Sequence, residues 1–389
     1  MQQPETIRNP QLDVLDGRKS EWNQPAIRRW GFHNLSQISR YGLSIRSPRV
    51  MVLEKDQDRR IDELPSVRRM TGAVQFSGLA VVRHSTLLHE DYAADFGSDQ
   101  THSIQSISKT TMHFAIGRLV DAGKIDTSKT VSHYIPEIGT GYAGATIQQV
   151  LDMDVINNFA EDYSGPYEHE AAVNGVMSYT RQEIALGWRL PPPGEDNVNI
   201  RPFSALLTSD DVANPTGNME YRSANTDVLA WIAERVSGVS VRDMLIEIVE
   251  AAGIEENFFM STDSTGVPIV SGGGALTARD LARYGQLFVR GGVGVNGAMV
   301  GGANFMKETL NGRGTVVDEC PHGVRYSNQT FTNGHWYGHA GFAGQFLTAH
   351  PATGISVAYF SVVETEDAHD DEIFNDIMGM SQDIIALYE

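Results

Sequence analysis

QSISKTTMHFAIGRLVDAG, residues 105–123, has the spacing of an amphipathic helix with a serine at its start. The apolar side chains that recur at helical spacing are Ile107, Phe114, Ala115, Leu119 and Val120. Such spacing predicts one buried helix face. Gly123 fits the left-handed position that commonly ends a helix. The pattern therefore predicts a helix over this stretch, with Ser106 in its first turn.

Ser106 and Lys109 lie one helical turn apart and on the same face of this helix, so the lysine amine can reach the serine hydroxyl. A serine becomes a good nucleophile when a neighbouring base takes its proton, and a lysine can be that base only when it is neutral. Burial lowers a lysine pKa from about 10.4 by up to ~3–5 units. Free N–H groups at the helix start also face the oxygen on which charge develops.

A simpler interpretation makes Ser106 a helix cap and Lys109 a solvated surface lysine. The small number of lysines in the sequence makes this interpretation less convincing. The six lysines are Lys19, Lys55, Lys109, Lys124, Lys129 and Lys307. Of these, only Lys109 has a serine three positions before it, and its helix is otherwise largely apolar. This favours a serine and lysine pair for acyl transfer.

Composition excludes several other classes of protein. The 389 residues carry 49 acidic and 30 basic side chains, for a net charge of −19. Such a charge repels nucleic acids and anionic lipid surfaces, so we expect no nucleic-acid partner. The sequence has no apolar run of signal-peptide or membrane-span length, so we expect no membrane segment and a cytoplasmic protein.

Cysteine and histidine give no sign of a metal centre or an organic cofactor. Cys320 is the only cysteine, which excludes an internal disulfide and a cysteine-based zinc site. The twelve histidines show no metal-ligand spacing. We therefore expect no metal and no cofactor.

Flanking patterns predict further elements. Two β-rich runs, 72–83 and 86–92, predict a hairpin before the nucleophile helix. Residues 226–237, followed by Gly238, predict a helix. Strands are expected at about 338–349 and 355–363, and an acidic helix from Asp370 to Tyr388. We interpret its first carboxylates, Asp370, Asp371 and Glu372, as a solvated helix face.

Several short motifs, taken together, resemble the serine β-lactamase and penicillin-recognising family. The likeness is strongest to its carboxylesterase-like branch and the 6-aminohexanoate-dimer hydrolases, and it covers most of the chain. The motifs are Trp22-Asn-Gln-Pro with Arg29-Trp30, Ser106-Ile-Ser-Lys109, Gln149-Val-Leu-Asp-Met153, Glu161-Asp-Tyr163, the run from Tyr221 to Trp231, and Gly344-Gln345.

This resemblance implies that Ser106 is the acylated nucleophile, Lys109 its base, and Tyr221 a phenol that helps to pass a proton to the leaving group. Relatives often have Tyr-x-Asn at the second motif, whereas this chain has Ser223 in place of the asparagine. Tyr163 matches a tyrosine that in the 6-aminohexanoate-dimer hydrolases closes over the substrate. A surface aromatic in a loop is the alternative for Tyr163.

The third family motif, Lys-Thr-Gly on a strand, corresponds here to His339-Ala-Gly341. A histidine holds a substrate carboxylate more weakly than a lysine, which argues against a dedicated β-lactamase. By position, Phe342 is expected to supply the second oxyanion N–H, and Gly341 to let the substrate approach the backbone. For His339, a substrate contact and a plain strand residue are both open.

The expected fold is α+β, of the β-lactamase/transpeptidase type, with an antiparallel sheet flanked by helices. Residues 1–124 and 266–389 would form this α/β domain, and residues 125–265 a mostly helical domain with substrate loops. The run from His169 to Gly217 departs from the family pattern, so the substrate cannot be transferred from relatives.

The resulting hypothesis is a serine hydrolase that cleaves small linear amides or short-chain esters through an acyl-Ser106 intermediate. β-Lactamase or D-alanyl-D-alanine peptidase activity is one alternative. A non-catalytic binding protein on the same fold, with Ser106 only as a cap, is the other. The sequence leaves the oligomeric state open, with a homodimer as one arrangement.

Overall fold

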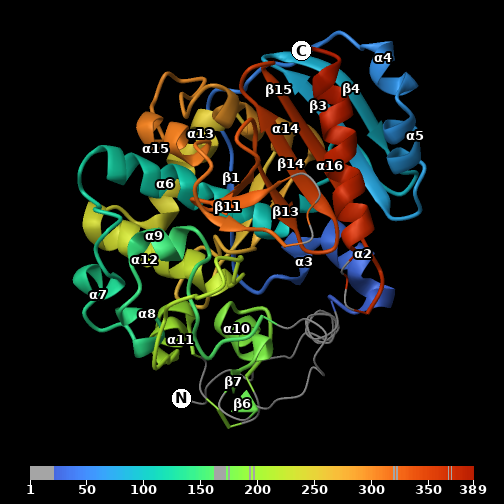
Figure 1. The fold of residues 1–389 in the computed structure, drawn as a ribbon. Helices are drawn as coiled ribbons and strands as arrows, with labels where there is room; N and C mark the ends of the chain where they lie inside the picture. Colours follow the sequence, from blue (N-terminus) through green and yellow to red (C-terminus); the bar gives the residue numbers. More distant parts are fainter. Residues whose placement is uncertain are drawn as a thin grey trace, which may run out of the picture.

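The computed structural model describes residues 22–161, 172–173, 176–191, 194–195, 198–318, 320, 323–366, 368 and 370–389. Within this part of the chain, a large sheet with helices on both faces lies beside a group of helices (Figure 1). The fold is therefore α+β, as the sequence predicts.

The large sheet has nine strands among the described residues and joins both ends of the chain. In spatial order its strands are β10 (Thr315–Val316), β11 (Arg325–Ser327), β12 (Thr330–Thr332), β13 (Tyr337–Gly341), β14 (Gln345–His350), β15 (Ile355–Ser361), β3 (Phe76–Arg83), β4 (Thr86–Tyr92) and β2 (Glu54–Lys55). Neighbouring strands are antiparallel except β2 and β4, which are parallel. The predicted hairpin is confirmed as β3 and β4.

Helices cover both faces of this sheet. α14 (Ala278–Val289) packs on β3, β14 and β15, and α16 (Asp371–Ala386) packs on β14, β15 and α5 (Pro65–Thr71). Because both faces are covered, every residue of β15 is buried, and so is every residue of β3 except Arg83. Gly285 allows α14 to approach closely, since a Cβ there would lie 2.8 Å from Ser356 Cβ.

A four-stranded sheet lies next to the segment that carries Ser106. Its order is β1 (Gly42–Ile45), β8 (Phe258–Ser261), β9 (Gly274–Leu276) and β5 (His102–Ser103). β8 falls inside the segment 125–265 that the sequence predicts to be mostly helical, and it pairs with β1 and β9. A short pair, β6 (Ala172–Val173) and β7 (Val176–Met177), forms a separate two-stranded sheet.

The remaining helices are spread along the chain. They are α2 (Pro25–His33), α3 (Leu35–Ile38), α4 (Arg59–Glu63), α6 (Thr110–Asp121), α7 (Val131–Tyr134), α8 (Thr140–Ala143), α9 (Ile147–Leu151), α10 (Tyr179–Ala185), α11 (Ile200–Leu206), α12 (Ser223–Ser237), α13 (Val241–Ala252) and α15 (Ala303–Thr309). α12 is central, because it contacts α6, α7, α9, α11 and α13. Gly238 ends it in the left-handed conformation, as predicted.

Two predictions of element bounds need correction. The strand expected at 338–349 is two strands, β13 and β14, separated by a turn in which Ala343 and Gly344 have positive φ. The helix predicted over residues 105–123 begins as a 3-10 turn, η1 (Gln105–Lys109), and continues as α6. Both features place backbone close to Ser106, because β13 and β14 pack against η1.

Candidate active site

Ser106 and Lys109 are in direct contact in the turn η1. Lys109 Nζ lies 2.9 Å from Ser106 Oγ, 2.8 Å from Ser223 Oγ and 2.5 Å from the carbonyl oxygen of Ser271. Lys109 is fully buried, while Ser106 keeps 9% of its surface exposed. A buried amine therefore faces a hydroxyl that substrate can reach.

Burial lowers the pKa of Lys109 to about 8, while the charges of Glu161 and Asp227 act in the opposite direction. With a pKa near this value, roughly a tenth of the amine is neutral at pH 7. A lysine in water is almost fully charged at that pH. The site therefore supplies a lysine that can accept a proton.

The charged Lys109 amine donates to Ser106 Oγ, and the other partners of the amine allow the reverse direction once it is neutral. Ser223 Oγ donates to Glu161 Oε1 at 2.5 Å, so it can only accept from Lys109. The carbonyl oxygen of Ser271 also accepts. These two acceptors use both N–H groups of a neutral amine, and its lone pair is left for the hydroxyl proton of Ser106.

Tyr221 comes just before α12 and packs beside the pair, with Lys109 Nζ 4.9 Å from the centre of its ring. Burial raises the pKa of Tyr221 well above its usual range, and the Glu161 charge adds to this, while a hydrogen bond with Ser106 acts in the opposite direction. The phenol therefore keeps its proton at neutral pH and can donate it.

Sequence reasoning assigned no role to Glu161 or Asp227. Glu161 also accepts the backbone N–H of Ser223, so it holds the start of α12 against the lysine. Asp227 is buried on α12, and burial raises its pKa to about 7, while Lys109 lowers it. Asp227 follows Ser223 by one helical turn, so the sequence places both side chains on the same face of the helix. Glu161 is in a loop, and its signal in the sequence was its place in the Glu161-Asp-Tyr163 motif of the family resemblance.

The turn after β13 brings the expected oxyanion segment to Ser106. A Cβ on Gly341 would lie 2.8 Å from the Ile104 carbonyl oxygen and 2.6 Å from Gln345 Oε1, so only glycine fits there. Gln105, just before Ser106, has φ of +45°. Such backbone costs roughly 1–3 kcal/mol and is concentrated at functional sites. Ser106 and Phe342 both line the cavity described below.

His339 is fully buried, and the cavity lining does not include it. Its Nδ1 lies 2.6 Å from the Ala340 carbonyl oxygen and its Nε2 lies 3.1 Å from Tyr326 Oη. Burial, with the Lys109 charge as a second cause, lowers the pKa of His339 to about 3. The sequence left two roles open for His339, a substrate contact and a plain strand residue. Its geometry fits a neutral strand residue that does not contact the cavity. Tyr163 lies outside the described residues.

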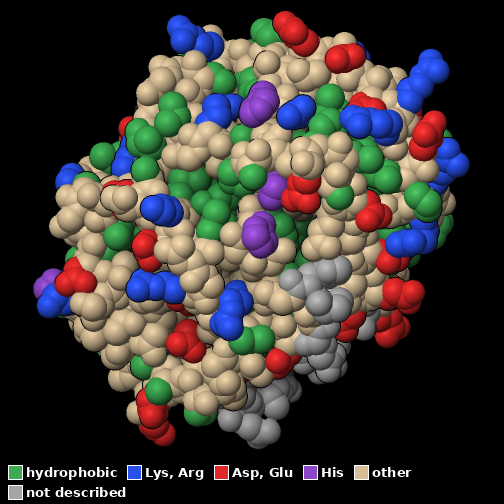
Figure 2. Space-filling model, turned by 45° about the horizontal axis from the view of Figure 1, so that its top comes forward, with side chains coloured by type: hydrophobic (Ala, Val, Ile, Leu, Met, Phe, Trp, Pro, Cys, Tyr) green, Lys and Arg blue, Asp and Glu red, His purple; other side chains and the backbone are tan. Residues whose placement is uncertain are grey.

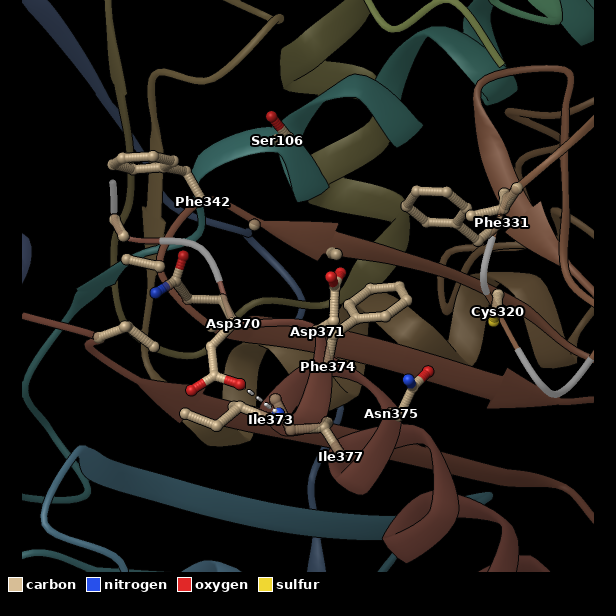
Figure 3. Close-up of a pocket in the computed structure, with 18 of the residues that line it drawn as sticks. Ser106, Cys320, Phe331, Phe342, Asp370, Asp371, Ile373, Phe374, Asn375 and Ile377 are labelled. Carbon is tan, nitrogen blue, oxygen red and sulfur yellow. Dashed lines mark hydrogen bonds between the residues drawn. The ribbon is translucent and has the colours of Figure 1, made fainter. Parts of the chain in front are cut away.

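A cavity of about 390 Å³, here called the wide compartment, opens in front of Ser106. Figure 3 shows Ser106 at one end of it, with Asp371 and Phe374 of α16 facing it and Phe342 and Phe331 on opposite sides. In Figure 2, hydrophobic side chains lie in a depression near the middle of the face shown, with charged side chains spread around it.

Three carboxylates, Asp318, Asp370 and Asp371, line the wide compartment. No Lys, Arg or His belongs to the lining among the described residues. The interpretation of Asp370 and Asp371 as part of a solvated helix face was therefore incomplete, because both border the same space as Ser106. Asp370 also caps α16, since its side chain accepts the backbone N–H of Ile373 at 3.0 Å.

A second, much smaller space lies against Ser106 and is here called the narrow compartment. Its volume is about 10 Å³, and Ser106 and Phe342 border both compartments. Polar side chains from several elements meet in it, namely Gln105, Glu161, Tyr179, Gln182, Ser223 and Ser271.

The described residues contain no group of three or more His, Cys, Asp or Glu side chains close enough to hold a metal ion. None of the helices in that part of the chain has the length and apolar character of a membrane span.

A buried lysine facing a serine, on this sheet-and-helix scaffold, defines a serine and lysine type of site. The family model described as Beta-lactamase matches residues 58–376, and the chain belongs to the β-lactamase family. Its sequence is 32% identical over 346 residues to the 6-aminohexanoate-dimer hydrolase of Paenarthrobacter ureafaciens, which covers 85% of this chain and 84% of that protein. The chain is therefore a hydrolase of this family.

Solved structures show the same fold. A Bacillus anthracis protein, named as a candidate 6-aminohexanoate-dimer hydrolase, superposes with a TM-score of 0.76 at 22% identity, over 94% of this chain and 96% of that one. A D-stereospecific amidohydrolase from a Streptomyces species superposes with a TM-score of 0.54 at 15% identity, over 82% of this chain and 97% of that one. The scaffold is thus β-lactamase/transpeptidase-like.

Proposed function

We propose that this protein is a serine hydrolase that cleaves small linear amides or short-chain esters through an acyl-Ser106 intermediate. The observation that carries the proposal is the contact of 2.9 Å between the buried Lys109 amine and Ser106 Oγ. The other partners of the amine leave its lone pair for the serine proton.

In the first step, Ser106 Oγ attacks the carbonyl carbon of the substrate while its proton passes to Lys109. The backbone N–H groups of Ser106 and Phe342 stabilise the oxygen that gains charge. Collapse of this intermediate breaks the bond to the leaving group. The leaving group takes its proton from Lys109, relayed by the Tyr221 phenol. Water then hydrolyses the acyl-enzyme.

The charges of the wide compartment favour substrates that place no negatively charged group in it. Its lining carries three carboxylates and no basic side chain among the described residues, so it repels the carboxylate of a penicillin. His339, at the position of the family lysine, lies outside the lining. Neutral or cationic linear substrates fit this charge pattern better. The 6-aminohexanoate-dimer hydrolase relative supports an amide substrate.

The test is turnover of a substrate panel containing p-nitrophenyl acetate, 6-aminohexanoate dimer and a chromogenic cephalosporin. We expect hydrolysis of the ester or the dimer, little turnover of the cephalosporin, and loss of hydrolysis in Ser106→Ala. The matched control is Ser128→Ala, which alters an exposed loop serine. Preference for the cephalosporin would support the β-lactamase alternative, and inertness towards all three substrates a binding protein.

A further inference from the structure

Ser106 separates two compartments of very different size. The wide compartment has room for an acyl chain, whereas the narrow compartment has a volume of about 10 Å³. A polar space of about 10–15 Å³ holds one water molecule when two to four polar groups surround it. The narrow compartment meets both conditions, because Ser106, Glu161, Gln182 and Ser223 border it.

Gln182 is the unusual member of this group. It lies on α10 and is 1% exposed, and neither its Oε1 nor its Nε2 has a hydrogen-bond partner among the described residues. Leaving a buried polar group unsatisfied costs about 1–3 kcal/mol. An apolar side chain of the same shape would avoid this cost, because the amide makes no hydrogen bond among the described residues.

The helix α10 directs this amide at the nucleophile. Tyr179, Gln182 and Leu186 follow one another at intervals of three and four residues, so they share one helix face, and all three border the narrow compartment. The amide carries one acceptor and two donors, which match the hydrogen-bonding groups of a water molecule. Its unsatisfied atoms and the size of the space point to the same ligand.

We propose that Gln182 orients the water molecule that hydrolyses acyl-Ser106, an inference that rests on the proposed function. The water oxygen attacks the acyl carbonyl carbon, forming a new C–O bond, and its proton passes to the neutral Lys109 amine. The intermediate collapses by breaking the bond between this carbon and Ser106 Oγ. The Lys109 ammonium returns a proton to Ser106 Oγ, and a carboxylic acid is released.

This assignment separates the two halves of the reaction. Acylation uses Ser106, Lys109 and the wide compartment, and it needs no water. Deacylation needs one water molecule placed against the acyl carbon. Loss of the Gln182 amide should therefore slow the second half and leave the first half unchanged.

The experiment is rapid quenching of the full-length protein during reaction with p-nitrophenyl acetate, with the acyl-enzyme fraction read by intact mass. Gln182→Met keeps the shape of the side chain and removes its hydrogen-bonding groups. We expect acyl-enzyme formation within about twofold of wild type and decay slower by on the order of tenfold or more. Thr180→Val, a buried position on the same helix outside the compartment lining, should change neither rate.

A second variant covers the case in which Gln182→Met does not fold. Gln182→Asn keeps the amide but withdraws it by one methylene, and its acyl-enzyme should decay at an intermediate rate. Equal slowing of formation and decay would overturn the inference, and so would unchanged decay. Absence of any acyl-enzyme in both the wild-type protein and Gln182→Met would instead overturn the proposed function, and this inference with it.

Discussion

The two compartments on either side of Ser106 differ in size and chemistry. The wide compartment, about 390 Å³, is built from the β13 to β14 turn and α16, and most of its lining is apolar. The narrow compartment, about 10 Å³, is built from α10, the loop at Glu161 and the start of α12. The comparison teaches that room for an acyl chain and room for a single water molecule lie in different parts of the molecule, on either side of Ser106. Each can therefore be perturbed alone.

The largest effect is expected from Lys109→Met, which removes the base between the compartments. We expect kcat/KM for ester hydrolysis to fall by on the order of 10³-fold or more. The control Lys307→Met alters an exposed lysine and should be neutral. Activity close to wild type in Lys109→Met would show that another group takes the serine proton.

The same variant should be more stable than wild type. Because burial lowers the pKa of Lys109 to about 8, the unfolded chain binds this proton more tightly than the folded chain. The amine therefore destabilises the fold below pH 8, and this cost fades as the pH rises above that value. We expect the melting temperature of Lys109→Met at pH 6 to be a few degrees higher than that of the wild-type protein. A lower one would contradict a buried amine with a depressed pKa.

Tyr221→Phe should have the next largest effect, and the effect should depend on the leaving group. An amine leaves only with a proton, whereas nitrophenolate leaves without one. We expect a loss of about 10²-fold for an amide and a much smaller loss for p-nitrophenyl acetate. Tyr388→Phe, a phenol that donates to Asp58 outside the site, is the matched control. Equal losses on both substrates would remove Tyr221 from the leaving-group step.

Phe374→Ala tests the wide compartment. Phe374 faces the cavity from α16 (Figure 3), and truncation removes apolar contact worth about 1–3 kcal/mol to a long acyl chain. We expect KM for a hexanoate ester to rise about tenfold, with little change for an acetate ester. Gln382→Ala, on the same helix outside the lining, should change neither. A uniform fall in kcat would mean that the compartment also shapes the chemistry.

Asp227→Asn should have the smallest effect and should act only on the pH profile. The rate should rise with pH as Lys109 loses its proton, with a midpoint near pH 8 in the wild-type protein. The Asp227 charge raises the pKa of Lys109, so its removal should move the midpoint down by a fraction of a pH unit. Asp243→Asn, an exposed position on α13, should leave the midpoint unchanged. An upward shift would contradict the electrostatic assignment.

Sequence reasoning predicted the elements whose signals are local. The Ser106 and Lys109 pair depends on one helical turn, and the β3 to β4 hairpin and α12 follow from periodicity and turn residues. The walls of the site could not be predicted in this way. Gln182, Glu161 and Asp371 approach Ser106 from three separate elements, and only long-range packing brings them together.

The turn between β13 and β14 shows a second limit of sequence reasoning. One strand was predicted at about 338–349, because the positive φ of Ala343 has no local signal in an alanine. For His339, the sequence did carry a signal, but the structure places the side chain differently. Its position in the family motif suggested a substrate contact, whereas its contacts with Tyr326 and Ala340 depend on how the sheet is buried.

Covalent labelling tests the central claim most directly. The protein is incubated with a serine-directed alkyl phosphonate, and the modified residue is mapped by peptide mass spectrometry at pH 6 and pH 9. We predict a single adduct on Ser106 that forms faster at pH 9, where Lys109 is neutral, and that is absent from Ser106→Ala. An adduct on another residue, or no adduct in a protein that still hydrolyses esters, would contradict Ser106 as the nucleophile.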